Sequence, residues 1–169
     1  MIVLVGFMGA GKTTVGQLLS ERLGLPFVDS DLVIEQRAGR SVPRIFAEDG
    51  EPAFRELERE VIGDLIDGPQ AVLALGGGAA EHPETKVRLK SAQVVYLQVG
   101  YAEAMGRVAG DDYRPLLRRP DLDALYRRRL EVYDEVATVT VATDGRRPEA
   151  VSGSRQNQPT GVKRGKRIG

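Results

Sequence analysis

The sequence of 169 residues lacks cysteine, carries no excess charge of either sign and has no long apolar run. Without cysteine, a disulfide framework and metal sites with thiolate ligands are excluded, and a cytoplasmic location fits. Basic and acidic residues are equally numerous, 24 of each, which argues against a nucleic-acid-binding domain because such domains usually present a basic surface. The apolar start MIVLVGFMGAGK has no charged leading region and soon reaches glycine and lysine, so we expect neither a signal peptide nor a membrane span.

Short runs rich in β-branched residues alternate with segments of helical periodicity along the chain. The runs that we predict as strands are residues 2–5, 26–28, 71–75, 94–99 and 138–141. One helical stripe consists of Val15, Leu18, Leu19 and Leu23, and a second consists of Phe54, Leu57, Val61 and Leu65, widened by Ile62 and Ile66. Strands that alternate with helices predict an α/β fold in which helices cover both faces of a parallel sheet.

No internal repeat or interdomain linker interrupts residues 1–150, which we predict to form a single domain. Two stretches depart from the alternating pattern. Residues 110–121, GDDYRPLLRRPD, are polar and basic, and a loop this long in a compact domain is usually functional or disordered. Residues 151–169 contain five lysines and arginines, no acid and few apolar side chains, so we predict a disordered basic tail.

The first predicted strand leads directly into GFMGAGKTT, residues 6–14. This matches the phosphate-binding pattern G-x-x-x-x-G-K-[ST], and it lies between a strand and a helix as that motif requires. Glycines let backbone N–H groups surround phosphate oxygens, and the helix N-terminus adds partial positive charge. Lys12 is predicted to contact the β- and γ-phosphates, and the Thr13 hydroxyl to bind Mg²⁺. The alternative, a glycine-rich turn followed by a chance Lys-Thr pair, is disfavoured by the strand–helix context.

Two acids follow the second predicted strand, in FVDSD. If the chain stays extended, Asp29 and Asp31 lie on one face, so that one acid can serve a metal while the other faces a substrate hydroxyl. Aspartate is also a favoured helix N-cap, and residues 32–36 look helical, so the cap is an open alternative. Beside a phosphate-binding loop the functional interpretation is favoured, because ligands of open α/β sheets bind at strand ends.

In their order and spacing, the motifs resemble the shikimate kinase family of P-loop small-molecule kinases. The resemblance covers residues 1–150 and rests on GFMGAGKTT, DSD, DGEPAFRELE (49–58), LGGGAA, RPLL (114–117) and RRRLEVY (127–133). It implies a three-layer P-loop kinase fold with a five-stranded parallel sheet and a lid at about residues 110–121. It also implies Mg-ATP-dependent phosphorylation of the 3-hydroxyl of shikimate, in the biosynthesis of chorismate and the aromatic amino acids. One Mg²⁺ per subunit, ATP as co-substrate and a monomer are expected.

The resemblance implies a substrate site built on the end of AVLALGGG. The segment Gly76, Gly77 and Gly78 would line the shikimate pocket, where side chains would fill the space that the ring needs. The alternative is a turn with unusual dihedral angles, but three glycines exceed what one turn needs. Arg55 and Arg129 would grip the substrate carboxylate, since a guanidinium fork fits a carboxylate.

Each of these arginines has a plainer interpretation. Arg55 can form an ion pair with Glu58 along its helix, and both interpretations can hold at once. Any of Arg127, Arg128 and Arg129 can point inward, although the spacing to Tyr133 selects Arg129.

The acids and the nucleotide site follow from the same resemblance. Asp29 would join Thr13 in the magnesium shell, while Asp31 would bind the reacting hydroxyl as the candidate base. ATP would be bound by Gly9, Ala10, Gly11, Lys12, Thr13, Thr14, Arg107, Arg114, Arg146 and Pro148. Arg114 would act as a lid arginine over the phosphates, although it can also be an ordinary charge on a mobile loop. The catalytic residues would be Lys12, Asp31 and Arg114.

Several points stay open. Arg107 and the segment Arg146–Pro148 resemble the walls of an adenine site, but one residue of slippage leaves Arg146 and Arg147 as alternatives. His82 is expected to be an exposed loop residue and not a base. After Glu149-Ala150-Val151 the apolar periodicity stops, so the final amphipathic helix of the family should be very short or missing. A kinase of another polyol acid, such as gluconate, and a non-catalytic nucleotide-binding module are the alternative functions.

Overall fold

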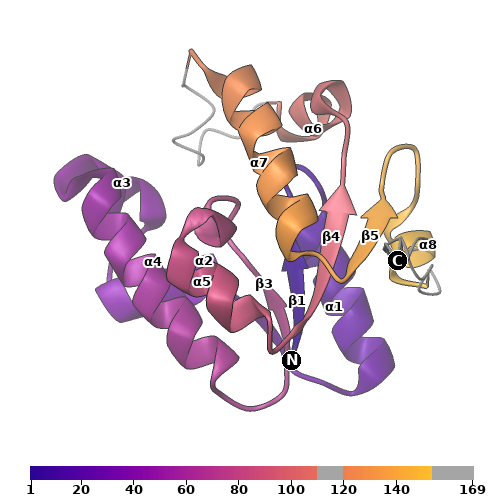
Figure 1. Ribbon diagram of the computed structural model, residues 1–169, viewed down its shortest axis with the longest axis horizontal. Helices are drawn as coiled ribbons and strands as arrows, with labels where there is room; N and C mark the ends of the chain where they lie inside the picture. Colours follow the sequence, from indigo (N-terminus) through magenta and orange to yellow (C-terminus); the bar gives the residue numbers. More distant parts are fainter. Residues whose placement is uncertain (110–119, 154–169) are drawn as a thin grey trace, which may run out of the picture.

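The computed structural model describes residues 1–109 and 120–153 (Figure 1). The strands of these residues are β1 (Ile2–Val5), β2 (Phe27–Asp29), β3 (Val72–Ala74), β4 (Gln93–Gln98) and β5 (Val139–Ala142). Their α-helices are α1 (Lys12–Leu23), α2 (Ser30–Ala38), α3 (Val42–Glu48), α4 (Gly50–Ile66), α5 (Pro83–Leu89), α6 (Tyr101–Val108), α7 (Leu122–Val136) and α8 (Pro148–Ser152). A short 3₁₀ helix, η1 (Ala79–Glu81), connects β3 to α5.

The five strands form one parallel sheet in the order β2-β3-β1-β4-β5. Each lies within one or two residues of its predicted run, which confirms the five-stranded parallel α/β fold. The central strand β1 is almost fully buried, as expected for a parallel strand with both faces covered. Because the strands are parallel, the segments that follow β1, β2 and β3 meet at one edge of the sheet, where ligands of such folds bind.

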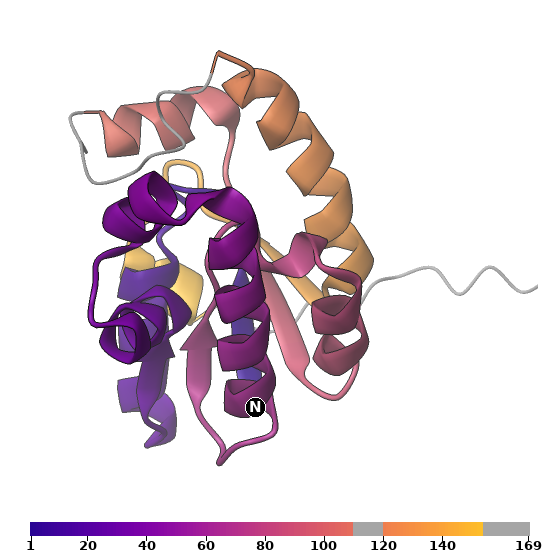
Figure 2. The same ribbon diagram turned by 90° about the vertical axis from the view of Figure 1, so that its left-hand side faces the viewer.

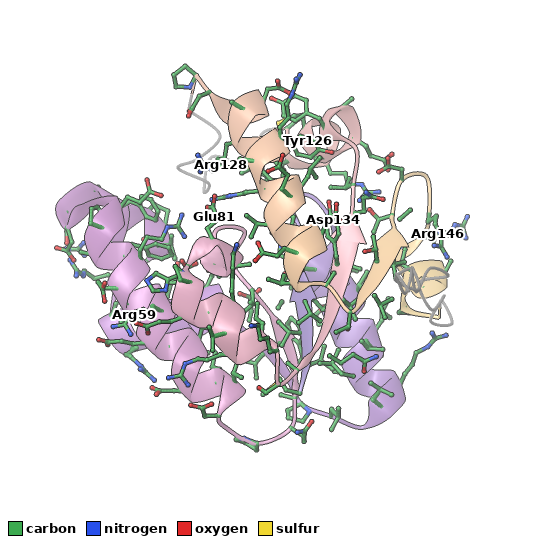
Figure 3. All side chains as sticks on the ribbon, in the orientation of Figure 1. Arg59, Glu81, Tyr126, Arg128, Asp134 and Arg146 are labelled. Atoms are coloured by element: carbon green, nitrogen blue, oxygen red, sulfur yellow. The ribbon has the colours of Figure 1, made fainter. Side chains whose placement is uncertain are left out.

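Helices lie on both sides of this sheet. Figure 2 shows α5 and α7 on one side and α8 on the other, and α8 contacts α1. Helix α4 contacts α2, α3 and α5. Tyr126 of α7, labelled in Figure 3, packs edge-on against Phe7, with 5.1 Å between ring centres. It also lies tilted against Tyr101 of α6, at 5.3 Å, so the three rings join α6 and α7 to the loop after β1.

Within the described residues, the apolar core has two parts. The larger part joins both faces of the sheet, while a smaller one holds α2, α3 and α4 together through Ile34, Ile45, Phe54 and Val61. The predicted stripe of α4 faces these cores. The stripe of α1 is shorter than predicted: Val15 is buried, but Leu23 is 48% exposed. Leu23 is the last residue of its helix, and Gly24 ends α1 in a left-handed conformation.

The C-terminal boundary of the domain differs from the prediction at residue 150. Helix α8 is very short, as expected, yet it extends to Ser152, and Val151 is 5% exposed and belongs to the larger core. One well-placed apolar side chain is enough to dock this helix, so Val151 is part of the fold and not of a tail. The remaining predicted tail, residues 154–169, and most of the predicted lid, residues 110–119 with Arg114, lie outside the described residues.

Candidate active site

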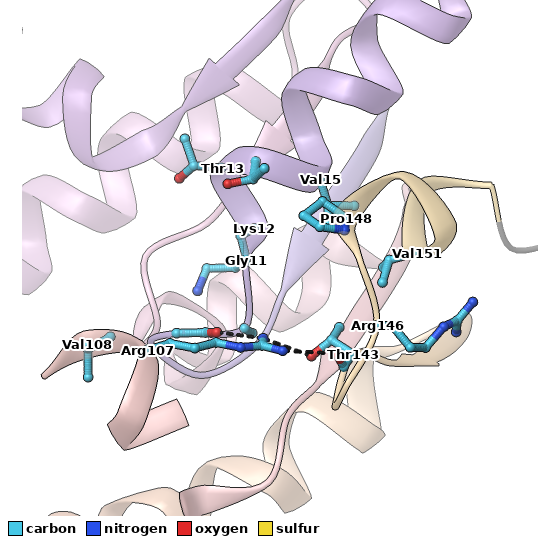
Figure 4. A pocket seen from close by; sticks show the side chains of 13 residues that line it. Gly11, Lys12, Thr13, Val15, Arg107, Val108, Thr143, Arg146, Pro148 and Val151 are labelled. Carbon is cyan, nitrogen blue, oxygen red and sulfur yellow. Dashed lines mark hydrogen bonds between the residues drawn. The ribbon is translucent and has the colours of Figure 1, made fainter. Parts of the chain in front are cut away.

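A pocket of about 410 Å³ opens at the loop between β1 and α1 (Figure 4). It is lined by Gly9, Ala10, Gly11, Lys12, Thr13, Thr14, Val15, Arg107, Val108, Thr143, Arg146, Pro148 and Val151. The residues predicted to bind ATP are thus brought together, apart from Arg114, which is not described. The pocket combines a helix N-terminus, a lysine and two arginines, a composition suited to a polyanion.

The loop itself depends on glycine. Gly9 has a φ of 76°, and a Cβ there would lie 2.7 Å from the carbonyl oxygen of Ala104. Gly11 caps α1 with a φ of 87°. The α1 N-terminus therefore opens into the pocket beside Lys12, whose Nζ donates hydrogen bonds to the carbonyl oxygens of Gly6 at 2.8 Å and Phe7 at 3.2 Å. These bonds hold the ammonium group against the loop.

Arg107 joins the phosphate loop to the far wall of the pocket. Its Nη1 donates to the carbonyl oxygen of Gly9 at 3.0 Å, and its Nη2 donates to that of Thr143 at 2.9 Å. Glu103 also accepts from Arg107, and the backbone N–H of Gly145 together with Arg107 holds the pKa of Glu103 below its usual value. Arg107 is therefore fixed by contacts from three segments.

The wall beyond Arg107 is closed by the turn between β5 and α8. Arg146 lines the pocket and donates to the carbonyl oxygens of Ala142 and Ala150, each at 3.1 Å. Arg147, the residue that precedes α8, is exposed as well but does not line the pocket. Of the two arginines left open by the sequence, Arg146 is the one at the pocket.

Asp29 stands where the phosphate loop meets the end of β2. Its Oδ1 accepts from the backbone N–H of Asp31 at 3.0 Å and so caps α2. Its Oδ2 accepts from the hydroxyl of Thr13 at 3.2 Å. The prediction that Asp29 and Asp31 lie together on extended chain is wrong, because α2 begins at Ser30 and places Asp31 in its first turn. The N-cap alternative is correct, but the second carboxylate oxygen of Asp29 still faces Thr13.

Thr13 and Asp29 offer few oxygen ligands for a metal ion. The described residues hold no group of three or more His, Cys, Asp or Glu side chains that could bind a metal ion. Mg²⁺ commonly uses only one or two protein ligands and completes its shell with phosphates and water. The Thr13–Asp29 pair beside the phosphate loop fits that mode of binding.

The three glycines after β3 are crowded by side chains of the site itself. A Cβ on Gly76 would lie 2.6 Å from Oδ1 of Asp31. One on Gly77 would lie 3.2 Å from Nη1 of Arg129, and one on Gly78 would lie 2.6 Å from Nη1 of Arg55. From the sequence, we predicted that the absent side chains of these glycines leave room for a ligand. In the structure, the absent side chains also make room for the groups predicted to bind that ligand.

Arg55 forms the ion pair with Glu58 that was predicted as the simpler alternative to substrate binding. Its Nη1 donates to Oε2 of Glu58 at 2.7 Å, and its Nη2 donates to Oε1 of Glu51 at 3.1 Å. Glu58 is only 3% exposed; burial raises its pKa, against the opposing effect of the Arg55 charge. The pair holds the guanidinium beside Gly78, so the two interpretations of Arg55 are compatible.

Arg129 is the buried member of the RRR run. It is 1% exposed, whereas the side chains of Arg127 and Arg128 are 76% and 60% exposed. Its Nε and Nη2 donate to Oε2 of Glu81, at 3.2 and 3.1 Å. Its Nη1 is buried and has no hydrogen-bond partner among the described residues.

Tyr133, one turn after Arg129, fixes the glycine segment from the same helix. Burial raises the pKa of Tyr133, so its hydroxyl keeps its proton and donates to the carbonyl oxygen of Gly77 at 2.6 Å. On the opposite side, the backbone N–H of Gly76 donates to the hydroxyl of the fully buried Ser30. The segment is therefore held from both α7 and the start of α2.

Sequence reasoning did not assign a site role to Ser30, Glu58, Glu81 or Thr143. Ser30 and Glu58 lie inside motifs that were recognised, so their positions were a usable signal. Nothing in the sequence pointed to Glu81. His82 is not simply an exposed loop residue: it is half-buried and caps α5, since its Nδ1 accepts from the backbone N–H of Glu84 at 3.3 Å.

Comparisons with known proteins agree with this geometry. Residues 8–157 match the sequence model of the family described as shikimate kinase. A shikimate kinase of Thermobifida fusca (strain YX) is 50% identical over 152 residues, which cover 88% of each chain. The structure of the enzyme from Acinetobacter baumannii in complex with shikimate is 39% identical, with a TM-score of 0.83, and covers 89% of this chain and 87% of that one.

A gluconokinase from Sinorhizobium meliloti is more distant. It is 20% identical with a TM-score of 0.56, over 89% of this chain and 86% of that one, and this likeness shows the fold alone. The fold is thus shared by kinases of several substrates. The fold alone therefore does not identify the family. The match over residues 8–157 and the 50% identity to a relative do: the chain belongs to the shikimate kinase family.

Proposed function

We propose that this protein transfers the γ-phosphoryl group of Mg-ATP to the 3-hydroxyl of shikimate and forms shikimate 3-phosphate, a step toward chorismate and the aromatic amino acids. The observation that carries the proposal is that two arginines and an aspartate converge on Gly76–Gly78, one strand away from the phosphate-binding loop. The relative from A. baumannii, whose structure contains shikimate, supports the choice of substrate.

In this proposal ATP lies in the pocket of Figure 4, with its phosphates on Gly9 to Thr14 and its adenine between Arg107 and the turn of Arg146 and Pro148. Lys12 stabilises the negative charge on the transferred group. Thr13 and Asp29 would hold one Mg²⁺ per subunit. When bound, this ion supplies charge neutralisation at the phosphates.

The substrate lies across the glycine segment. Arg55 and Arg129 bind its carboxylate, and Asp31 accepts the proton of the reacting hydroxyl. Because phosphoryl transfer needs little covalent help from the protein, positioning and electrostatics are expected to supply most of the catalysis. Arg114, outside the described residues, remains the proposed lid arginine and third catalytic residue.

The remaining proposals concern the setting of the reaction. In the described part of the chain, no helix is long and apolar enough to cross a membrane. We propose a cytoplasmic monomer whose partners are its two small-molecule substrates and not nucleic acid.

The decisive experiment is a coupled assay of ADP release from ATP, with shikimate, with gluconate and without an acceptor. We expect release that depends on shikimate and on Mg²⁺, with little release in the other two reactions. Strong release with gluconate, or nucleotide binding without shikimate-dependent release, would overturn the proposal.

A further inference from the structure

Glu81 contacts the arginine at the centre of the proposed substrate site, although it belongs to none of the motifs that identify the family. It ends η1, three residues after Gly78, and its two carboxylate oxygens have different partners. Oε2 accepts from Nε and Nη2 of Arg129, and Oε1 accepts from Nε of Arg128 at 3.0 Å. Two consecutive arginines of α7 thus hold one carboxylate, and Figure 3 shows the Glu81 and Arg128 side chains near each other beside α7.

The choice of donors determines where Arg129 points. Nε and Nη2 form one edge of the guanidinium group, and Glu81 occupies that edge. The other edge of the guanidinium group, made by Nη1 and Nη2, lies at the glycine segment. Nη1 is 3.2 Å from a Cβ built on Gly77, and Nη2 is 2.7 Å from one built on Gly78. Nη1 is also the atom that is buried and has no hydrogen-bond partner among the described residues.

A buried guanidinium group is costly unless its N–H groups are satisfied, and it would turn toward solvent or other acceptors without a fixed partner. Arg129 is 1% exposed, so its direction depends strongly on that partner. Glu81 is in turn held by Arg128, whose side chain is 60% exposed and bonds to Oε1 of Glu81 through Nε and Nη2.

Building on the proposed function, we infer that Glu81 is a positioning residue of the substrate site. Its carboxylate holds one edge of Arg129 so that the other edge is preoriented toward the carboxylate of shikimate, and Arg128 anchors Glu81 from the outside. The role is indirect: Glu81 acts through Arg129 and does not touch the substrate. It is expected to set the affinity for the acid substrate and not the rate of transfer.

The test compares shikimate kinetics of Glu81→Ala, Glu81→Gln and Arg128→Ala. We expect Glu81→Ala to raise the KM for shikimate about tenfold, as for loss of one charge-assisted hydrogen bond, with kcat and the KM for ATP changed less than about threefold. Glu81→Gln keeps an acceptor oxygen and should recover part of the loss. Arg128→Ala should have the same effect as Glu81→Ala but smaller.

Glu135→Ala is the matched control. Glu135 also lies on α7 and forms an ion pair with Lys86 of α5, but its side chain is 60% exposed and is not among the groups that crowd the three glycines. We expect the Glu135→Ala variant to have the shikimate KM of the wild type. A rise equal to that of Glu81→Ala would indicate a general effect of weakening α7 and would overturn the inference.

A double-mutant cycle isolates the role through Arg129. In an Arg129→Ala background, Glu81→Ala should raise the shikimate KM no further, because the group that it positions is gone. An unchanged or lowered KM for Glu81→Ala in an active protein would overturn the inference alone. Wild-type protein without shikimate-dependent ADP release would overturn the proposed function and, with it, this inference.

Discussion

Gly78 is the residue at which the two arginines of the proposed substrate site come closest together. A Cβ built there would lie 2.6 Å from Nη1 of Arg55 and 2.7 Å from Nη2 of Arg129. Its φ of −97° is open to any residue, so glycine is needed for space and not for conformation. Both arginines are tied to carboxylates, by Glu58 and Glu81, and cannot give way freely. The missing side chain therefore determines how the arginines are arranged.

This crowding predicts the effect of Gly78→Ala. The added methyl group should displace at least one guanidinium group and raise the shikimate KM by about tenfold or more, as for the loss of a charged hydrogen bond. The KM for ATP should stay near the wild-type value, because neither Gly78 nor the two arginines line the nucleotide pocket. Steady-state kinetics with each substrate varied in turn will measure both constants.

Gly106→Ala provides the control for that substitution. Gly106 lies within α6, and a Cβ built there meets no atom of the described residues within 4 Å, so this change should alter neither constant. A Gly78→Ala protein with normal shikimate KM would show that the arginines do not bind the substrate carboxylate from their present positions.

At the scale of elements, the start of α2 combines helix capping with the proposed metal site. The two carboxylate oxygens of Asp29 are divided between these tasks, with Oδ1 on the helix and Oδ2 on Thr13. Asparagine caps helices about as well as aspartate, but its neutral amide is a poorer ligand for Mg²⁺. The two tasks can therefore be separated by substitution.

We expect Asp29→Asn to keep the melting temperature and to lower turnover by about tenfold or more at a fixed Mg²⁺ concentration, as for loss of a preorganised electrostatic group. Asp29→Ala should lose the same activity and, in addition, about 1 kcal/mol of stability from the missing cap. Calorimetry and a titration of activity with Mg²⁺ measure the two effects. Full activity of Asp29→Asn at low Mg²⁺ would exclude Asp29 from the metal shell.

The elements also show which features a sequence can predict. Parallel strands are apolar on both faces, so the five short runs were visible, and the phosphate loop is a local motif with fixed spacing. The burial of Arg129 followed from its spacing to Tyr133. The pairing of Glu81 with Arg129 joins segments 48 residues apart, and no local pattern encodes it. The helical placement of Asp31 was missed because strand and cap signals overlap in DSD.

At the scale of the whole molecule, the sheet places the two proposed ligands at the ends of two neighbouring strands, β1 and β3. The loop after β1 lines the nucleotide pocket, and the glycine segment after the neighbouring β3 lies against Arg55 of α4 and Arg129 of α7. The opposite wall of the nucleotide pocket comes from the end of the described chain, through Arg146, Pro148 and Val151. Helix α8 therefore contributes to the fold and to the pocket together.

The last prediction concerns how firmly this short helix belongs to the fold. Val151 is 5% exposed, lies in the larger core and lines the nucleotide pocket. Val151→Ala removes two buried methyl groups and should cost about 1–2 kcal/mol, less a few tenths for the better helix propensity of alanine. For a chain of this size that lowers the melting temperature by about 2–8 °C, and the KM for ATP should rise as the wall loosens.

Leu23→Ala is the matched apolar control. Leu23 was assigned to the buried stripe of α1 from the sequence but is 48% exposed, so its truncation should change stability by no more than about 0.5 kcal/mol. Thermal unfolding of both variants, with and without ATP, shows how much each side chain contributes to stability. If Val151→Ala melts with the wild type while Leu23→Ala melts several degrees lower, Val151 does not close the core, and the domain ends at residue 150 as predicted from the sequence.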